Sequence, residues 1–174
     1  MTQLVNRKSQ KIPHSPIRHM FNLASQMQNV INFGIGEPDF ATPMHIARAG
    51  ADAACSGFTH YTANAGDIRL RRAIVSEFGN RCGLEYSPER EVIVSLGAME
   101  ALFLAQQVTL EPGDEVVIPA PAWPNYVAQV LLADGVPVLA PVKEENGFRL
   151  TREILESHLT PKTRAVLINT PANP

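Results

Sequence analysis

The sequence predicts an α/β protein whose mostly parallel sheet is covered by helices on both faces. Short apolar runs rich in β-branched residues recur along the chain, for example Glu115–Ile118 and Ala165–Ile168, as expected of strands buried on both faces. Segments with apolar residues at helical spacing separate these runs, which is the pattern of strand–helix–strand units. Of the 174 residues, 45% are hydrophobic and 18% are charged, the usual composition of a folded domain.

Residues 1–40 contain one predicted helix and one short predicted strand. Ser15 is suited to cap the helix and Pro16 to occupy its first turn, where a missing N–H removes no hydrogen bond. The strand is Val30–Phe33, which leads into the glycine-containing turn Gly34–Phe40. The apolar side chains of the helix repeat at helical spacing at Ile17, Met20, Phe21 and Ala24.

From residue 41 the pattern is more regular and begins with two helices. Thr42 and Pro43 are an N-cap and first-turn pair, which opens a helix that runs toward Cys55. A second helix follows Gly66 and ends at Gly83. Its apolar residues share one face and are Leu70, Ala73, Ile74 and Phe78.

Strands and helices then alternate to the last residue. The predicted strands are Glu91–Ser95, Glu115–Ile118, Val136–Val142 and Ala165–Ile168. The predicted helices are Ala98–Leu110, Asn125–Asp134, which Gly135 is expected to stop, and a helix from its cap Thr151 to His158. A parallel sheet normally covers a final strand with a following helix, so we expect the chain to be a truncated part of a larger domain.

Charge and composition argue against several classes of partner. The formal net charge is −2, which predicts no binding to nucleic acid or to an anionic membrane surface. No apolar run approaches the roughly 18 residues of a transmembrane helix, and the N-terminus lacks the apolar segment of a secretory signal. The two cysteines predict reduced thiols in a cytoplasmic protein, and neither they nor the five histidines have metal-ligand spacing.

Ligands of parallel α/β sheets bind beyond the carboxyl ends of the strands, so the residues after each strand are the candidates. The turn at Gly97, Ala98 and Met99 opens a helix, whose N-terminal N–H groups are able to bind an anion such as phosphate. A tight strand-to-helix turn is the alternative. The glycine fingerprints of dinucleotide and nucleoside triphosphate sites are absent, so neither ligand is predicted.

Four further residues stand out, each with a plainer alternative. Trp123, the only tryptophan, follows a predicted strand and is suited to stack on a planar ligand, or else belongs to the core. Asn173 offers an amide to a ligand, or forms an Asn-Pro turn. Gly36 leaves bare backbone for a carboxylate, or marks a domain-entry turn, and Tyr61 offers a hydroxyl, or lies on the surface.

The order of the motifs is more specific than any one of them. Along the chain they are Gly36-Glu-Pro-Asp-Phe40, Tyr61…Gly66…Leu70-Arg71, Gly97-Ala-Met-Glu-Ala-Leu102, Pro112-Gly-Asp-Glu115, Pro121-Ala-Trp123 and Asn173-Pro174. From about Ile12 to the last residue, this order resembles the class I and II aminotransferases, which are fold-type I enzymes dependent on pyridoxal 5'-phosphate. The resemblance implies that residues 1–40 are an N-terminal arm with part of a small domain. It implies that residues 41–174 are the first part of a truncated, cofactor-binding large domain.

The resemblance also assigns roles around the cofactor. The backbone N–H groups of Gly97, Ala98 and Met99 would bind its phosphate, Trp123 would stack on its pyridine ring, and Asn173 would hydrogen-bond its phenolic oxygen.

Two other residues receive roles from the same resemblance. Gly36 would contact the carboxylate of the amino acid or 2-oxo acid substrate. Tyr61 would reach the phosphate of the neighbouring subunit's cofactor, so the resemblance implies a homodimer.

No catalytic residue is assigned in this chain. In the family, the Schiff-base lysine, an aspartate that pairs with the pyridine nitrogen and a substrate-binding arginine lie beyond the Asn-Pro motif. The four lysines here are Lys8, Lys11, Lys143 and Lys162, and none is placed like the Schiff-base residue. We therefore expect the 174-residue chain alone to be inactive. The alternatives to an aminotransferase part are a catalytically inactive truncated fragment and a carbon–sulfur lyase on the same fold.

Overall fold

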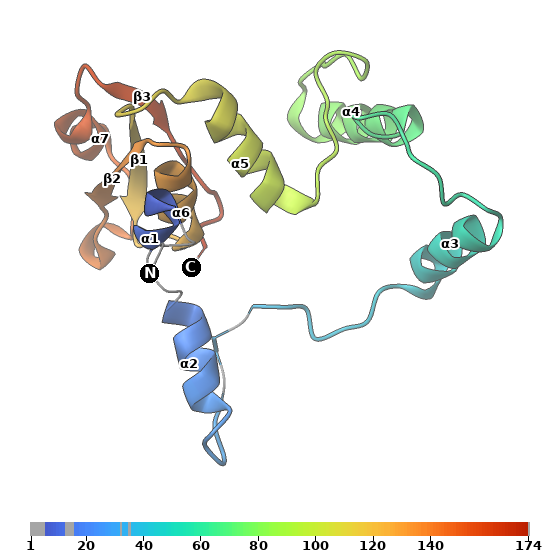
Figure 1. Ribbon diagram of the computed structural model, residues 1–174, viewed down its shortest axis with the longest axis horizontal. Helices are drawn as coiled ribbons and strands as arrows, with labels where there is room; N and C mark the ends of the chain where they lie inside the picture. The colour runs from blue at the N-terminus through green and yellow to red at the C-terminus, as the bar shows by residue number, and fades with distance from the viewer. Residues whose placement is uncertain (1–5, 13–15, 32, 35, 174) are drawn as a thin grey trace. The chain divides into compact units, whose positions relative to one another are not determined.

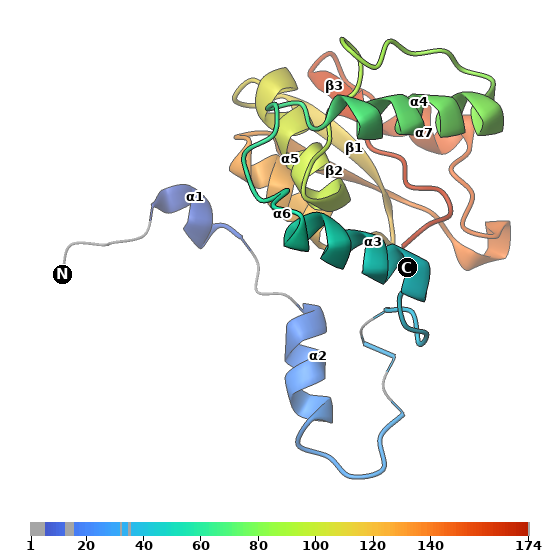
Figure 2. The same ribbon diagram turned by 90° about the vertical axis from the view of Figure 1, so that its right-hand side faces the viewer.

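A computed structural model describes residues 6–12, 16–31, 33–34 and 36–173 (Figures 1 and 2). The described chain forms two compact units. One is built from Met1–Asn32 together with Met99–Pro174, and the other from Phe33–Ala98.

The first unit contains a three-stranded parallel sheet. Its strands are β1 (Glu115–Ala120), β2 (Val136–Pro141) and β3 (Thr163–Val166), in the order β2-β1-β3. The register pairs Val117 of β1 with Val138 on one side and with Val166 on the other. The predicted α/β class with a parallel sheet is confirmed.

Helices connect the strands across both faces of this sheet. α6 (Asn125–Leu132) joins β1 to β2, and the short 3₁₀ helix η1 (Glu144–Asn146) with α7 (Arg152–His158) joins β2 to β3. The two connections cross the sheet in opposite directions, because β1 lies between its neighbours. Right-handed crossovers therefore place α6 and α7 on opposite faces, as Figure 1 shows.

The core follows from the central position of β1. Val116 and Ile118 point to the face covered by α6, where they belong to a cluster of buried side chains with Val130 of that helix. Val117 points to the opposite face, as the two-residue period of a strand requires, and is also fully buried. The central strand is thus covered on both sides.

The residues that follow α6 differ from the prediction in their conformation and contacts. The helix ends at Leu132, two residues before the predicted end, and Asp134 rather than a glycine takes the left-handed conformation with φ 59°. Gly135 has another role than the predicted one. A Cβ there would lie 3.0 Å from Val130 Cγ1 and 3.2 Å from the carbonyl oxygen of Asp114, so glycine lets this segment pack closely against the Val130 side chain and the backbone before β1.

The remaining helices of this unit are α1 (Arg7–Gln10), α2 (Pro16–Ala24) and α5 (Gly97–Thr109), whose first two residues belong to the other unit. α2 and α5 confirm the predicted helices, although the predicted cap Ser15 lies outside the described residues. Lys8 of α1 forms an ion pair with Asp134, just after α6.

The Phe33–Ala98 unit contains α3 (Met44–Cys55) and α4 (Ile68–Cys82), which confirm two predicted helices. α4 begins at the cap Asp67 and ends at Gly83, which takes the predicted left-handed conformation with φ 67°. The predicted cap of α3 is wrong by one residue: Pro43 occupies that position and makes no side-chain cap hydrogen bond.

Two predicted strands are wrong. Glu91–Ser95 is irregular, and its Val94 N–H donates to the carbonyl of Ala65 at 3.0 Å rather than to a strand. The described residues of Val30–Phe33 are also irregular, and Ile31 and Phe33 are exposed. Both segments have strand-like composition, but a strand exists only where another segment supplies hydrogen-bond partners.

The other strands differ from prediction only at their ends. β1 extends two residues further than predicted, to Ala120, and β2 ends one residue earlier, at Pro141. β3 begins and ends two residues before the predicted range, so that Ile168 follows the strand.

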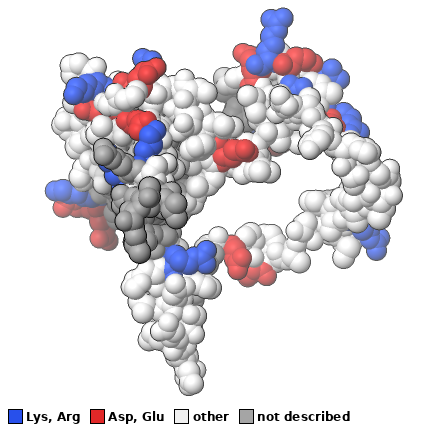
Figure 3. Space-filling model, viewed as in Figure 1, with Lys and Arg blue, Asp and Glu red and all other residues white. Residues whose placement is uncertain are grey.

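Charged side chains of both signs are interspersed on the face drawn in Figure 3. Ion pairs among the described residues include Arg152 Nε with Glu156 Oε1 at 2.7 Å and Arg164 Nε with Asp114 Oδ2 at 3.8 Å. In the part of the chain that the structure describes, no helix has the length and apolar character needed to cross a membrane.

The cap of α4 predicts a titration. The side chain of Arg69 and then its backbone N–H, which donate to Asp67 at 2.6 and 2.8 Å, lower the pKa of Asp67 to about 2. Because this pKa is below that of the unfolded chain, the carboxylate stabilises the helix start above about pH 4, and this contribution is lost as the pH falls toward 2.

Carbon-13 NMR of the Asp67 carboxyl should follow this low pKa directly. In Arg69→Gln the pKa should rise toward its ordinary value. Arg72→Gln is the matched control, because Arg72 pairs with Glu89 instead. An unchanged Asp67 pKa in Arg69→Gln would contradict the assignment.

Candidate functional site

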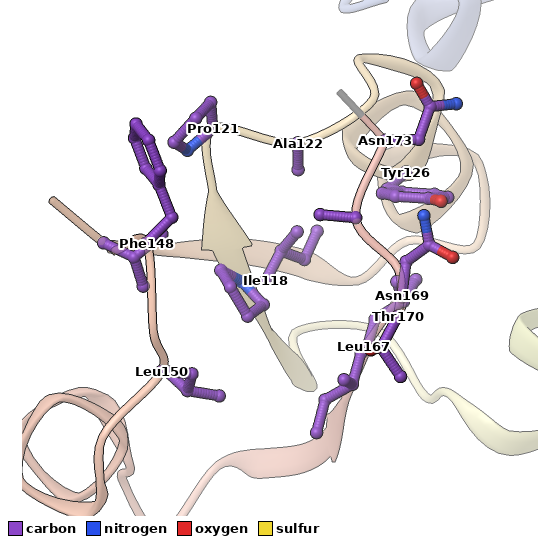
Figure 4. Close-up of a pocket in the computed structure, with 14 residues that line it drawn as sticks. Ile118, Pro121, Ala122, Tyr126, Phe148, Leu150, Leu167, Asn169, Thr170 and Asn173 are labelled. Atoms are coloured by element: carbon purple, nitrogen blue, oxygen red, sulfur yellow. The ribbon is translucent and has the colours of Figure 1, made fainter. Parts of the chain in front are cut away.

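A pocket of about 580 Å³ lies at the carboxyl ends of the three strands (Figure 4). Ile118 and Pro119 reach it from β1, Val142 follows β2, and Leu167 follows β3. Most of its lining is apolar. The polar side chains at its wall are Tyr126, Asn169, Thr170 and Asn173.

Two opposite walls of the pocket come from different connections. Phe148 and Leu150, which follow η1, form one wall, and Tyr126 and Asn173 lie on the other side (Figure 4). The wall at Phe148 follows a tight turn, in which Gly147 has φ 62° and the Phe148 N–H donates to the carbonyl of Lys143 at 2.9 Å. The pocket is thus built where ligands of parallel α/β sheets bind.

An aromatic pair borders this pocket at the start of α6. The rings of Trp123 and Tyr126 are edge-to-face, with centroids 5.5 Å apart and planes at 83°. Tyr126 is buried and lines the pocket, whereas Trp123 packs half-buried against the core cluster and is not among the lining residues. The core contact that the sequence offered as the alternative is therefore present at Trp123, whose ring also contacts the pocket-lining Tyr126.

Met99, in the first turn of α5, is contacted by two polar side chains of α6. Gln129 Nε2 donates to the Met99 carbonyl at 2.9 Å and lies 3.2 Å from its sulfur atom. Asn125 Nδ2 lies 3.8 Å from the same sulfur. Asn125 and Gln129 are four residues apart and share one helix face.

Gly97 begins α5 with φ 76°, a conformation that favours glycine. Its N–H donates to the carbonyl of Ser95 at 2.8 Å, and the Ser95 hydroxyl donates to the carbonyl of Gly97 at 3.0 Å. A Cβ on Gly97 would meet nothing within 4 Å, so backbone conformation rather than space selects glycine there.

The predicted site residues divide between the two units. Met99, Trp123 and Asn173 belong to the unit that holds the pocket, and only Asn173 lines it. The others, in the Phe33–Ala98 unit, are Gly36, Tyr61, Gly97 and Ala98. Tyr61 is fully exposed.

Sequence reasoning missed two residues of this region. Tyr126 lines the pocket, and Gln129 holds Met99. A signal for Gln129 was present, because a carboxamide interrupts an otherwise apolar run in α6, but its partner lies 30 positions away and leaves no mark in a local pattern.

An aromatic pair and an amide side chain lie at the strand ends, and a helix begins at a glycine turn that leaves space beside it. In the described ranges, no three His, Cys, Asp or Glu side chains are grouped to hold a metal ion.

Comparison with known proteins decides the family. Residues 28–174 match the family model described as aminotransferase class I and II. The chain belongs to this family. The resemblance inferred from the order of motifs is confirmed.

Curated relatives in this aminotransferase family are similar over most of the chain. The aromatic-amino-acid aminotransferase 2 of Thermococcus litoralis is 41% identical over 160 residues, which cover 92% of this chain and 41% of that protein. An aspartate aminotransferase of Geobacillus stearothermophilus is 48% identical over 146 residues, which cover 84% of this chain and 37% of that protein. The chain thus spans less than half the length of these relatives.

Solved structures agree. The aspartate aminotransferase of Rhizobium meliloti has a TM-score of 0.93 at 41% identity and matches 99% of this chain and 44% of its own. The aromatic aminotransferase of Pyrococcus horikoshii has a TM-score of 0.82 at 42% identity and matches 91% of this chain and 42% of its own. The fold-type I assignment is therefore confirmed by structure as well as by sequence.

The turn at the start of α5 predicts the effect of a substitution. Gly97→Ala should destabilise the chain by about 1 kcal/mol, because an L side chain is strained at this positive φ although it meets no atom. Gly97→Asn should cost less, because asparagine tolerates the left-handed region. Urea denaturation of the two variants and of the unchanged chain measures both losses in the free energy of unfolding. Equal stabilities of the alanine and asparagine variants would show that the φ of Gly97 is not the reason for glycine.

Proposed function

We propose that this chain provides cofactor-binding residues of an aminotransferase, which moves an amino group between an amino acid and a 2-oxo acid. The cofactor would be pyridoxal 5'-phosphate. The observation that supports this most directly is the pocket at the strand ends, with Asn173 in its wall and the Trp123–Tyr126 pair at its border. The relatives' names, which include aspartate and aromatic aminotransferases, support the reaction class.

The roles of the residues follow from their chemistry. The first turn of α5, at Gly97, Ala98 and Met99, would hold the phosphate through backbone N–H groups, and Trp123 would stack on the pyridine ring. Asn173 would donate its amide N–H to the phenolic oxygen. When bound, the cofactor supplies an electron-withdrawing ring that stabilises negative charge at the substrate α-carbon. Gly36, which has no neighbour within 4 Å of a Cβ, would offer its backbone to the substrate carboxylate.

The lysines of this chain support the expectation that it does not catalyse transamination alone. All four are exposed, and none lines the pocket: Lys8, Lys11, Lys143 and Lys162. Lys8 and Lys143 are engaged in ion pairs with Asp134 and Glu145. Without a lysine at the cofactor there is no side-chain base for the proton of the α-carbon. Formation of 2-oxo acid above the rate of free cofactor, abolished by replacing one lysine, would refute this.

A homodimer is part of the proposal. Tyr61 is fully exposed in its unit, as required of a side chain that would reach the cofactor phosphate of a second subunit. Exposed apolar side chains such as Phe40 and Leu96 in the same unit offer area for such an interface. Sedimentation that gives a monomer at all concentrations would exclude it for this chain.

We also propose where the domains of this chain begin and end, and in which cellular compartment the protein lies. Residues 1–40 would be an arm with part of a small domain, and residues 41–174 the first part of the large domain, although the compact units divide at residues 32 and 98. Limited proteolysis that spares the region near residue 40 would count against this boundary. The free thiols of Cys55 and Cys82 suit the reducing cytoplasm, where we propose that the protein lies. Cell fractionation tests this location.

Trp123 provides an intrinsic signal for cofactor binding, because it is the only tryptophan. Pyridoxal 5'-phosphate should quench its fluorescence saturably, and so should pyridoxine 5'-phosphate, which lacks the aldehyde that reacts with exposed lysines. By equilibrium dialysis, Trp123→Ala should weaken binding about fivefold, because stacking contributes about 1 kcal/mol. Trp123→Phe keeps an aromatic ring and is the control. Unsaturable quenching, or equal affinity of all three proteins, would refute the stacking role.

Asn173 should act on the titration of the bound ring. A donated hydrogen bond favours the charged form of a phenol and lowers its pKa. Asn173→Ala should therefore raise the pKa of the phenol in bound pyridoxine 5'-phosphate, as followed by its ultraviolet absorbance against pH. Asn169→Ala is matched, because Asn169 lines the same pocket but has no assigned contact with the ring. Equal phenol pKa values in the two variants would mean that Asn173 does not contact the phenolic oxygen.

A further inference from the structure

Among the described residues of the unit that holds the pocket, two glutamine side chains are buried, and they differ in their hydrogen bonding. Gln129 of α6 is 3% exposed, and its Nε2 donates to the Met99 carbonyl at 2.9 Å. Gln106 of α5 is 7% exposed, and neither its nitrogen nor its oxygen has a hydrogen-bond partner. The chain thus contains a buried carboxamide with a defined contact and a second one without any.

The position of Gln129 has a cost that packing does not explain. Burying a carboxamide is unfavourable unless its polar atoms are hydrogen-bonded. The Oε1 of Gln129 is buried with no partner, so only half of the group is satisfied. An apolar side chain of similar size would fill this place in the core without that penalty. What only the carboxamide supplies is the hydrogen bond to Met99.

That hydrogen bond joins two helices at a defined point. Met99 is the third residue of α5, two positions after Gly97, where the helix begins in the left-handed conformation. Asn125 contacts the Met99 sulfur atom from the same face of α6, one turn before Gln129. Trp123 lies just before α6, and its carbonyl accepts from the N–H of Tyr126 at 3.1 Å. α6 therefore extends from the aromatic pair to the first turn of α5.

We propose that Gln129 is a positioning residue for the phosphate of the cofactor. By holding the Met99 carbonyl, it fixes the direction of the first turn of α5, and with it the N–H groups that point out of that helix end. A phosphate bound there is recognised by direction and distance, so a turn that is free to tilt binds it less tightly. This inference rests on the proposed function, because it assumes that the turn receives a phosphate.

The test separates the phosphate from the rest of the ligand. Pyridoxine 5'-phosphate and pyridoxine differ only in the phosphate group, and neither has an aldehyde for exposed lysines. The dissociation constant of pyridoxine divided by that of pyridoxine 5'-phosphate, both measured for the 174-residue chain by equilibrium dialysis, gives the contribution of the phosphate. Gln129→Met keeps the length and packing of the side chain but removes the donor. Gln106→Met is the matched control, because that carboxamide makes no hydrogen bond.

We expect Gln129→Met to lower this ratio about tenfold, the effect of losing one well-made hydrogen bond, with the affinity for pyridoxine unchanged. Gln106→Met should leave both affinities unchanged. If Gln129→Met folds poorly by circular dichroism, Gln129→Asn serves instead, because its shorter side chain cannot span the distance to Met99. It should show the same loss.

Each of the other outcomes would contradict either the proposed cofactor placement or the positioning role of Gln129. If the native chain binds both ligands equally, the phosphate does not lie at this turn and the proposed function loses its cofactor placement. If the native chain prefers the phosphate ester and the Gln129 variant keeps the full preference, the positioning role is refuted. An equal loss of affinity for both ligands would also refute it, because that is the effect of a general loss of packing.

Discussion

The burial of β1 on both faces is the constraint on which the pocket-bearing unit depends. Val116 and Ile118 are covered on the side of α6, and Val117 is covered on the other side. A strand buried in this way needs one crossover helix on each face, which the order β2-β1-β3 provides. The carboxyl end of β1 then opens between the two connections, and the pocket forms there.

The same packing fixes the residues around the pocket. α6 is held on the sheet by Val130, and Gly135 allows the chain to turn tightly into β2. The start of the helix therefore sets the Trp123–Tyr126 pair at the strand ends, while Gln129 faces the first turn of α5. One face of α6 packs in the core, and the same helix carries residues of the candidate site. The apolar burial of α6 therefore also orients the polar groups at that site.

Some buried side-chain polar atoms in this interior have no hydrogen-bond partner. Gln106 has no partner for either atom of its carboxamide, and Gln129 has one for its nitrogen alone. Buried polar atoms usually have partners, and the one hydrogen bond of the half-satisfied Gln129 goes to the first turn of α5. In a family whose relatives are aspartate and aromatic aminotransferases, the helix end in question is the one proposed to bind phosphate.

The fold class, the family, and the helices with local start and stop signals could be predicted from the residues alone. Thr151 caps α7 through its hydroxyl, and Gly83 ends α4 in the left-handed conformation, because these contacts lie within a few residues of chain. Which apolar runs became strands depended on contacts between segments far apart along the chain. β1 pairs with a neighbouring strand on each side, whereas Glu91–Ser95 is irregular and pairs with no strand among the described residues. The tertiary structure also set the contact between Gln129 and Met99 and the close approach at Gly135. The physical reason is the same in each case, because a ladder hydrogen bond, a buried carboxamide and a backbone contact each need a partner that is distant along the chain.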